Sequence, residues 1–106
     1  MAIVSILHRL SGLALFLLLP FLLYFLDISL ESGERFSQVS QFFQGFPGKL
    51  LLWVTISTTL FHVVAGIRHL LMDFGIGETL KGGRCSAWTV MITSAVLALL
   101  TGIWLW

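Results

Sequence analysis

Charged residues are scarce in this chain, and that scarcity excludes an ordinary soluble protein. Only 10% of its 106 residues are Asp, Glu, Lys or Arg, whereas 58% are hydrophobic. The mean hydropathy is +1.00, a composition that soluble globular domains do not have. No stretch between the apolar segments is long enough for a globular core, so we expect no soluble catalytic domain. The formal net charge of +1 does not indicate a nucleic-acid partner.

The chain has a single cysteine and lacks a recognisable secretion signal. The single cysteine, Cys85, excludes an intrachain disulfide and a zinc cluster, and we expect it to be an unreactive reduced thiol. His8 and Arg9 precede an apolar run, as in a signal peptide. However, the run from Leu10 to Ile28 is too long for a signal peptide, and no small-x-small cleavage site follows it. The run is therefore interpreted as a retained transmembrane helix.

Three apolar segments are present, and each is long enough to cross a bilayer. The predicted helices cover residues 4–28, 49–73 and 87–106, and a hydrocarbon core of ~30 Å requires ~20 residues. Pro20 lies inside the first helix, where a membrane helix tolerates it with a kink. We therefore predict an all-α integral membrane protein with three transmembrane helices, in which residues 1–106 form one membrane-anchor domain.

The two connections differ in composition. The first, Ser29 to Gly48, is polar, and Pro47 marks the entry to the second helix. The second, Phe74 to Ser86, is rich in glycine, and Gly75 is predicted to cap the second helix.

The basic residues predict the orientation. One side of the membrane would carry Arg9, Arg68, Lys81 and Arg84, whereas Arg35 and Lys49 on the other side are offset by three carboxylates. The positive-inside rule then places the N-terminus and the second connection in the cytoplasm.

The segment that begins at Phe61 carries ionisable side chains inside an apolar run. Helical steps of three, four and seven place five residues on one face: His62, Ala65, Gly66, His69 and Asp73. An ionisable side chain at bilayer depth is costly and usually marks a functional site. Small residues beside it leave room for a flat, bulky group. His62 lies about 16 Å along the helix axis from the boundary residue Asp73, which is near the midplane.

Two interpretations of His62 follow from its position. A neutral imidazole has one donor and one acceptor, which a neighbouring helix could satisfy. Alternatively, His62 is an axial haem ligand. His69 lies about 10.5 Å further along the same face. If His62 binds a haem iron, His69 is therefore too far away to bind the opposite side of the same iron. We expect His8 to lie at the cytoplasmic end of the first helix, far from that depth. A second axial histidine would then come from another subunit.

Basic residues lie between His62 and the predicted cytoplasmic side. Arg68 is about 9 Å from His62 along the axis, comparable to the reach from haem iron to a propionate. His8, Arg9 and His69 lie at a similar level. Alternatively, Arg68 and Arg9 extend to lipid headgroups.

The N-terminal segment contains a second polar pattern. Ser5, Arg9 and Gly12 share one helix face. A serine can donate a hydrogen bond to a quinone carbonyl, and an arginine can stabilise the charge that develops on reduction. The alternative is a helix-capping serine and an arginine placed by the positive-inside rule.

Two motifs, Ser5-Ile-Leu-His-Arg…Ser11-Gly12 and His62-x-x-x-Gly66-Ile-Arg68-His69-Leu-x-x-Asp73, occur together with the three-helix pattern. In this combination the chain resembles the cytochrome b membrane-anchor subunit of succinate dehydrogenase, respiratory complex II. The resemblance covers nearly the whole chain. One departure is that four residues precede Ser5, whereas family members often carry a longer arm.

The resemblance implies a role for each motif. His62 matches the axial ligand of haem b, whose other ligand comes from a second small hydrophobic anchor subunit. Ser5 and Arg9 match residues of the ubiquinone site, and His8 and Arg9 match residues near the haem propionates.

The end of the second motif, His69 and Asp73, is assigned to the propionate or quinone neighbourhood. In such complexes a flavoprotein subunit oxidises succinate, and an iron–sulfur subunit passes the electrons to quinone. The implied location is the inner, cytoplasmic membrane of a bacterium. The chain would belong to an oxidoreductase without containing its dehydrogenase active site.

The residues are also compatible with three other functions. One is the haem-less anchor of a fumarate reductase-type complex, against which His62 counts. Another is a small transporter or channel component with His62 and Asp73 on a proton path, although the acidic residues all lie near helix ends. The third is a purely structural assembly partner.

Overall fold

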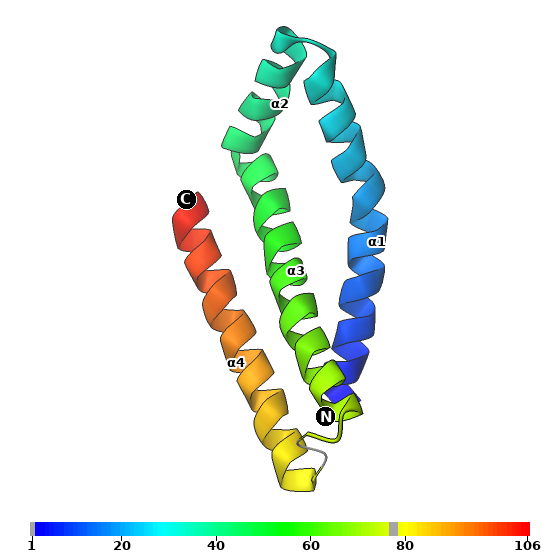
Figure 1. Ribbon diagram of the computed structural model, residues 1–106. Helices are drawn as coiled ribbons and strands as arrows, with labels where there is room; N and C mark the ends of the chain where they lie inside the picture. The colour runs from blue at the N-terminus through cyan, green and yellow to red at the C-terminus, as the bar shows by residue number, and fades with distance from the viewer. Residues whose placement is uncertain (1, 77–78) are drawn as a thin grey trace.

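The computed structural model describes residues 2–76 and 79–106 of the chain, and every regular element in them is a helix. The helices are α1 (Ala2–Glu31), α2 (Gly33–Gln44), α3 (Phe46–Asp73) and α4 (Leu80–Leu105). Figure 1 shows α3 between α1 and α4, with α2 at the end of the bundle remote from the N-terminus. Three helices are long and apolar enough to cross a membrane: Ile3–Glu31, Phe46–Asp73 and Lys81–Leu105. The predicted all-α fold with three spans is confirmed.

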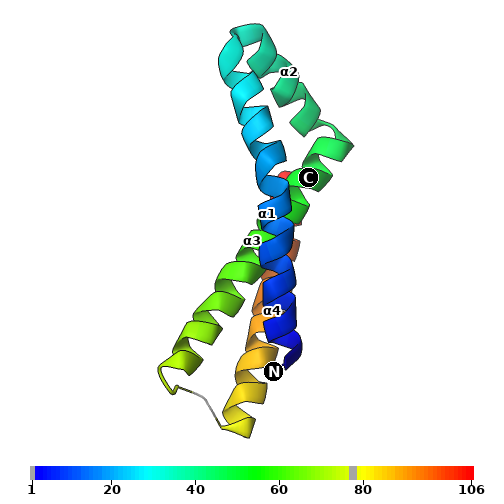
Figure 2. The same ribbon diagram turned by 90° about the vertical axis from the view of Figure 1, so that its right-hand side faces the viewer.

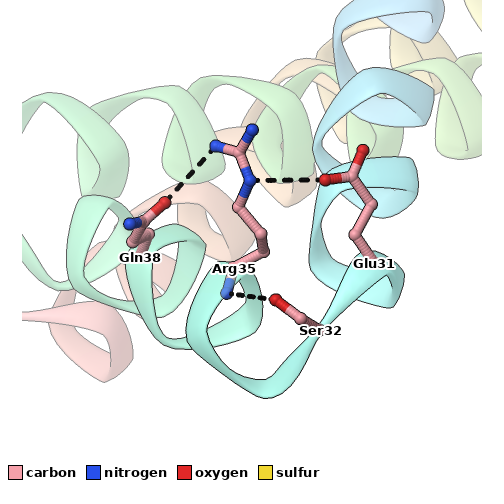
Figure 3. A network of polar contacts seen from close by, with 4 residues as sticks. All are labelled: Glu31, Ser32, Arg35 and Gln38. Carbon is pink, nitrogen blue, oxygen red and sulfur yellow. Dashed lines mark hydrogen bonds and ion pairs between the residues drawn. The ribbon is translucent and has the colours of Figure 1, made fainter.

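The first connection contains a helix that the sequence analysis did not predict. Ser32 has extended backbone angles and caps α2, because its Oγ accepts a hydrogen bond from the Arg35 backbone N–H at 3.1 Å. The Arg35 side chain pairs with Glu31 at 3.3 Å and donates to Gln38 at 3.5 Å (Figure 3). These contacts are exposed and individually weak. Together they mark where α1 ends and α2 begins.

The helix α2 folds back against α1 through aromatic side chains. The ring of Phe25 lies 5.3 Å from that of Phe42 and 5.1 Å from that of Phe43, measured between centroids. The chain then turns sharply into α3, which begins at Phe46, three residues before its predicted start. A Cβ atom on Gly48 would overlap the backbone carbonyl oxygen of Phe42. The corner between α2 and α3 therefore requires glycine at this position.

Replacing Gly48 with alanine is expected to destabilise this corner by about 1–3 kcal/mol, because overpacking must shift the backbone of α2. The measurement is the thermal unfolding midpoint of the purified chain in detergent. Gly33→Ala is the matched control, because no atom lies within 4 Å of the position its Cβ would take. Equal midpoints for the two variants would contradict this account of the corner.

The helices α3 and α4 are joined by hydrogen bonds at both ends. Trp53 Nε1 donates to the Ala98 carbonyl at 2.8 Å. At the other end, Arg68 donates from Nε to Ser86 Oγ at 2.9 Å and from Nη2 to the Gly83 carbonyl at 3.3 Å. The buried core of the described residues consists of Val4 from α1, Ala65 from α3, and Ala87 and Val90 from α4. The two alanines are small side chains, which let membrane helices approach closely.

The C-terminus of α3 is closed by the glycine that the sequence indicates. Gly75 has φ +82°, and its N–H donates to the Met72 carbonyl at 2.9 Å. The Ile76 N–H donates to the Leu71 carbonyl at 3.0 Å. This pair of bonds is the Schellman motif, so the predicted cap at Gly75 is confirmed.

The helix α4 begins earlier than the prediction of residue 87. Its first turn contains Gly82 and Gly83, which the sequence analysis assigned to the connection. The Thr79 side chain accepts a hydrogen bond from the Gly82 N–H at 3.0 Å and so caps the helix.

Candidate functional site

The three histidines of the chain gather between α1 and α3. The rings of His8 and His62 are stacked, with centroids 4.1 Å apart and planes inclined by 10°. The ring of His69 lies 6.3 Å from that of His8, inclined by 15°. We call these three residues the histidine stack. The sequence analysis placed His62 and His69 on one face of one helix, and the structure adds His8 from the neighbouring helix.

The expectation that His8 lies far from His62 is wrong. The two helices α1 and α3 cross at an angle (Figure 2), and the His8 ring on α1 stacks on the His62 ring on α3. Two glycines allow this approach. A Cβ atom on Gly12 would lie 3.1 Å from His62 Cε1, and a Cβ atom on Gly66 would lie 3.3 Å from His8 Nε2. The space that Gly66 leaves beside His62 is therefore filled in this chain by the His8 imidazole.

One ring nitrogen of His62 has a partner on α1. Its Nδ1 lies 2.8 Å from Ser11 Oγ, and the same hydroxyl lies 2.7 Å from the His8 carbonyl oxygen. Ser11 is only 8% exposed. In the described residues, His62 Nε2 makes no hydrogen bond. The neighbouring helix thus satisfies one of the two ring nitrogens.

The histidine stack cannot by itself enclose a metal ion. Among residues 2–76 and 79–106, no group of three or more His, Cys, Asp or Glu side chains is arranged to hold one. The rings are nearly parallel, and imidazole lone pairs lie in the ring plane, so those of stacked rings do not converge.

The other predicted site residues differ in their burial and in their partners. Arg68 is 6% exposed and bonds to α4, on a different side of α3 from the histidines. His69 Nε2 lies 3.8 Å from an Asp73 carboxylate oxygen, and both side chains are more than half exposed. On α1, Ser5 is half-buried and Arg9 is exposed. The structure thus brings His8, His62 and His69 together, and leaves Ser5 and Arg9 on the outer part of the chain.

A shallow apolar hollow of about 450 Å³ adjoins the stack on the side of Ser11. Its lining includes Leu7, Ser11, Ser57, Thr58, Phe61 and Met91, from α1, α3 and α4. Ser57 Oγ is buried there without a hydrogen-bond partner in the described residues. Ser11 and Gly12 belong to the first sequence motif, but no contact between them and His62 was predicted. Their positions three and four residues after His8 were the available signal, because they place them on the His8 face.

In the described residues, three helices long and apolar enough to span a membrane, with histidines packed between two of them, define a small integral membrane protein. The chain belongs to the succinate dehydrogenase/fumarate reductase transmembrane subunit family, whose model matches residues 1–101. The resemblance seen in the two motifs is therefore confirmed.

Individual relatives agree with this assignment. The chain is 45% identical to the succinate dehydrogenase cytochrome b556 subunit of Coxiella burnetii, over 100% of this chain and 86% of the relative. It is 32% identical to the subunit of the same name from Rickettsia felis, over 91% and 74% respectively. For the Paracoccus denitrificans subunit the identity is 29%, over 94% and 77%.

Proposed function

We propose that this chain is the haem b- and quinone-binding membrane anchor of a succinate dehydrogenase. The observation that carries the proposal is His62, an imidazole held by Ser11 near the middle of a membrane-spanning helix in a chain of this family. The relatives are named as cytochrome b556 subunits. The names of these relatives favour haem b as the cofactor that His62 would bind.

The residues around His62 fit one axial bond to a haem iron. Its Nδ1 is engaged by Ser11, whereas Nε2 makes no hydrogen bond in the described residues. The stacked His8 ring is parallel to that of His62 and does not point at the same position. The other ligand of the haem would then come from a second small anchor subunit. Held in this way, the haem would supply a one-electron store to the complex.

The haem propionates would be held by His8, Arg9 and His69, the cationic or hydrogen-bonding groups near the N-terminal end of α1. Arg68 lies at a suitable depth, but it would have to exchange its bonds to Ser86 and Gly83 to reach a propionate. Its contacts support a role in joining α3 to α4. We place Asp73, which pairs with His69, at the outer edge of this group.

The quinone site is placed at Ser5 and Arg9, one helical turn apart on α1. Neither side chain makes a hydrogen bond within the described residues, and a ligand held against a partner subunit would contact both. The Ser5 hydroxyl would donate to a ubiquinone carbonyl, and the Arg9 guanidinium would stabilise the negative charge that forms on reduction. The chain would thus position and polarise the quinone without oxidising succinate.

The partners and orientation follow from this assignment. The N-terminus is placed in the cytoplasm of a bacterium, where the flavoprotein and iron–sulfur subunits would meet the inner membrane. The excess of basic residues at that end of the bundle supports the orientation.

The direct test is purification of the complex through a C-terminal tag on this chain, followed by a dithionite-minus-oxidised spectrum. We expect a flavoprotein, an iron–sulfur protein and one further small hydrophobic subunit, together with the α-band of a b-type haem. Cells that carry the untagged chain serve as the control. Recovery of the soluble subunits without a pyridine haemochrome signal would contradict the haem assignment and favour the haem-less anchor of a fumarate reductase-type complex.

A further inference from the structure

The Ser11 hydroxyl contacts two groups that compete for its one hydrogen. Ser11 Oγ lies 2.7 Å from the His8 carbonyl oxygen and 2.8 Å from His62 Nδ1. Both distances are those of strong hydrogen bonds. A carbonyl oxygen carries no hydrogen and can only accept. An imidazole nitrogen can either donate or accept, depending on the tautomer.

Only one arrangement satisfies both contacts. If the Ser11 hydrogen pointed to His62 Nδ1, the hydroxyl oxygen and the His8 carbonyl oxygen would face each other at 2.7 Å with no hydrogen between them. That contact would be repulsive. With the hydrogen on the carbonyl side, Ser11 Oγ accepts from a protonated Nδ1. The neutral His62 ring then carries its proton on Nδ1 and its lone pair on Nε2.

We infer that Ser11 is a positioning residue that sets the tautomer of His62 and so leaves the lone pair of the neutral ring on Nε2. A metal-bound histidine usually donates its other N–H to a fixed acceptor, which sets the ring orientation and strengthens the ligand. The inferred tautomer rests on the contacts of Ser11 alone. Its use as a haem-ligand device rests on the proposed function.

Two further contacts keep the ring in this orientation. The His8 ring covers one face of His62 at 4.1 Å, and the backbone of Gly12 lies close to its Cε1 edge, where an added Cβ would stand at 3.1 Å. A half-turn of the ring would remove Nδ1 from Ser11 and present a carbon to it. The chain thus prepares the ligand before a haem binds.

The first experiment measures the tautomer directly in the full-length chain. The chain is labelled with ¹⁵N-histidine and placed in lipid nanodiscs without haem, and the His62 signals are assigned by their loss in His62→Gln. We expect the proton on Nδ1 in the wild type and in Ser11→Thr, which keeps a hydroxyl. A wild-type proton on Nε2, or an unchanged preference for Nδ1 in Ser11→Ala, would overturn the inference.

The second experiment uses the assembled complex and the midpoint potential of its haem. Loss of the Ser11 acceptor weakens donation by His62 and destabilises the ferric state. Second-sphere substitutions change metal affinity by about tenfold or more, and a tenfold change in a one-electron equilibrium corresponds to about 59 mV. We therefore expect Ser11→Ala to raise the midpoint by about this amount.

The matched control is Ser94→Ala. Ser94 is 8% exposed, as Ser11 is, but its hydroxyl has no hydrogen-bond partner in the described residues. We expect the wild-type potential in Ser94→Ala and in Ser11→Thr. An equal potential in Ser11→Ala and the wild type would overturn the role of Ser11 toward the haem. A complex that contains no haem would instead overturn the proposed function, and the tautomer measurement would still decide the inference about Ser11.

Discussion

Replacing Arg9 with leucine is expected to lower ubiquinone reduction by the assembled complex by about 100-fold or more. Removal of one charge-stabilising donor from a reaction site typically costs this much. Arg9 lies one helical turn from Ser5 on α1, and leucine supplies neither charge nor a hydrogen bond. The measurement is succinate-dependent ubiquinone reduction in membranes. Succinate oxidation with a soluble dye should be unchanged, because that reaction takes place in the flavoprotein.

The control for Arg9→Leu is Arg35→Leu. Both arginines are exposed, but Arg35 lies on α2, beside the C-terminal end of α1, and pairs with Glu31. We expect normal quinone reduction in Arg35→Leu and a loss of about tenfold in Ser5→Ala, as removal of a single hydrogen bond would produce. Normal activity in Arg9→Leu would place the quinone elsewhere and favour a purely structural anchor.

Replacing His62 with alanine is expected to abolish the b-type haem signal of the purified complex. Alanine removes the nitrogen that is assigned to the iron and also the partner of Ser11. The measurement is the dithionite-minus-oxidised spectrum, normalised to the flavin content. Val63→Ala is the matched control, because Val63 follows His62 directly on α3 and its side chain is exposed. We expect at least most of the haem signal to remain in that control.

The His62→Ala variant also distinguishes the proposed membrane anchor from a membrane transporter. A proton path through His62 and Asp73 predicts that His62→Ala lowers flux across proteoliposomes while the visible spectrum stays unchanged. A retained haem spectrum in His62→Ala would therefore contradict the proposed ligand. Since Asp73 is exposed and pairs with the exposed His69, the structure places no carboxylate beside His62 among the described residues.

The membrane spans could be predicted well because they depend on local properties. Length and hydropathy alone identify α1, α3 and α4, and the glycine at position 75 marks the end of α3. The helix α2 could not be predicted in this way. Its composition is polar, and it is stabilised by the cap at Ser32 and by packing of Phe42 and Phe43 on Phe25. Such packing is visible only after α1 and α2 have been placed together.

The candidate site divides along the same line. Helical periodicity placed His62 and His69 on one face, because residues seven positions apart return to the same side of a helix. The sequence by itself determined that face and the family motifs. Only the tertiary structure decided that His8 stacks on His62 and that Ser11 holds Nδ1. Those contacts depend on how closely the two crossing helices approach each other. Gly12 and Gly66 allow the close approach, but a local sequence pattern does not show which residues will meet.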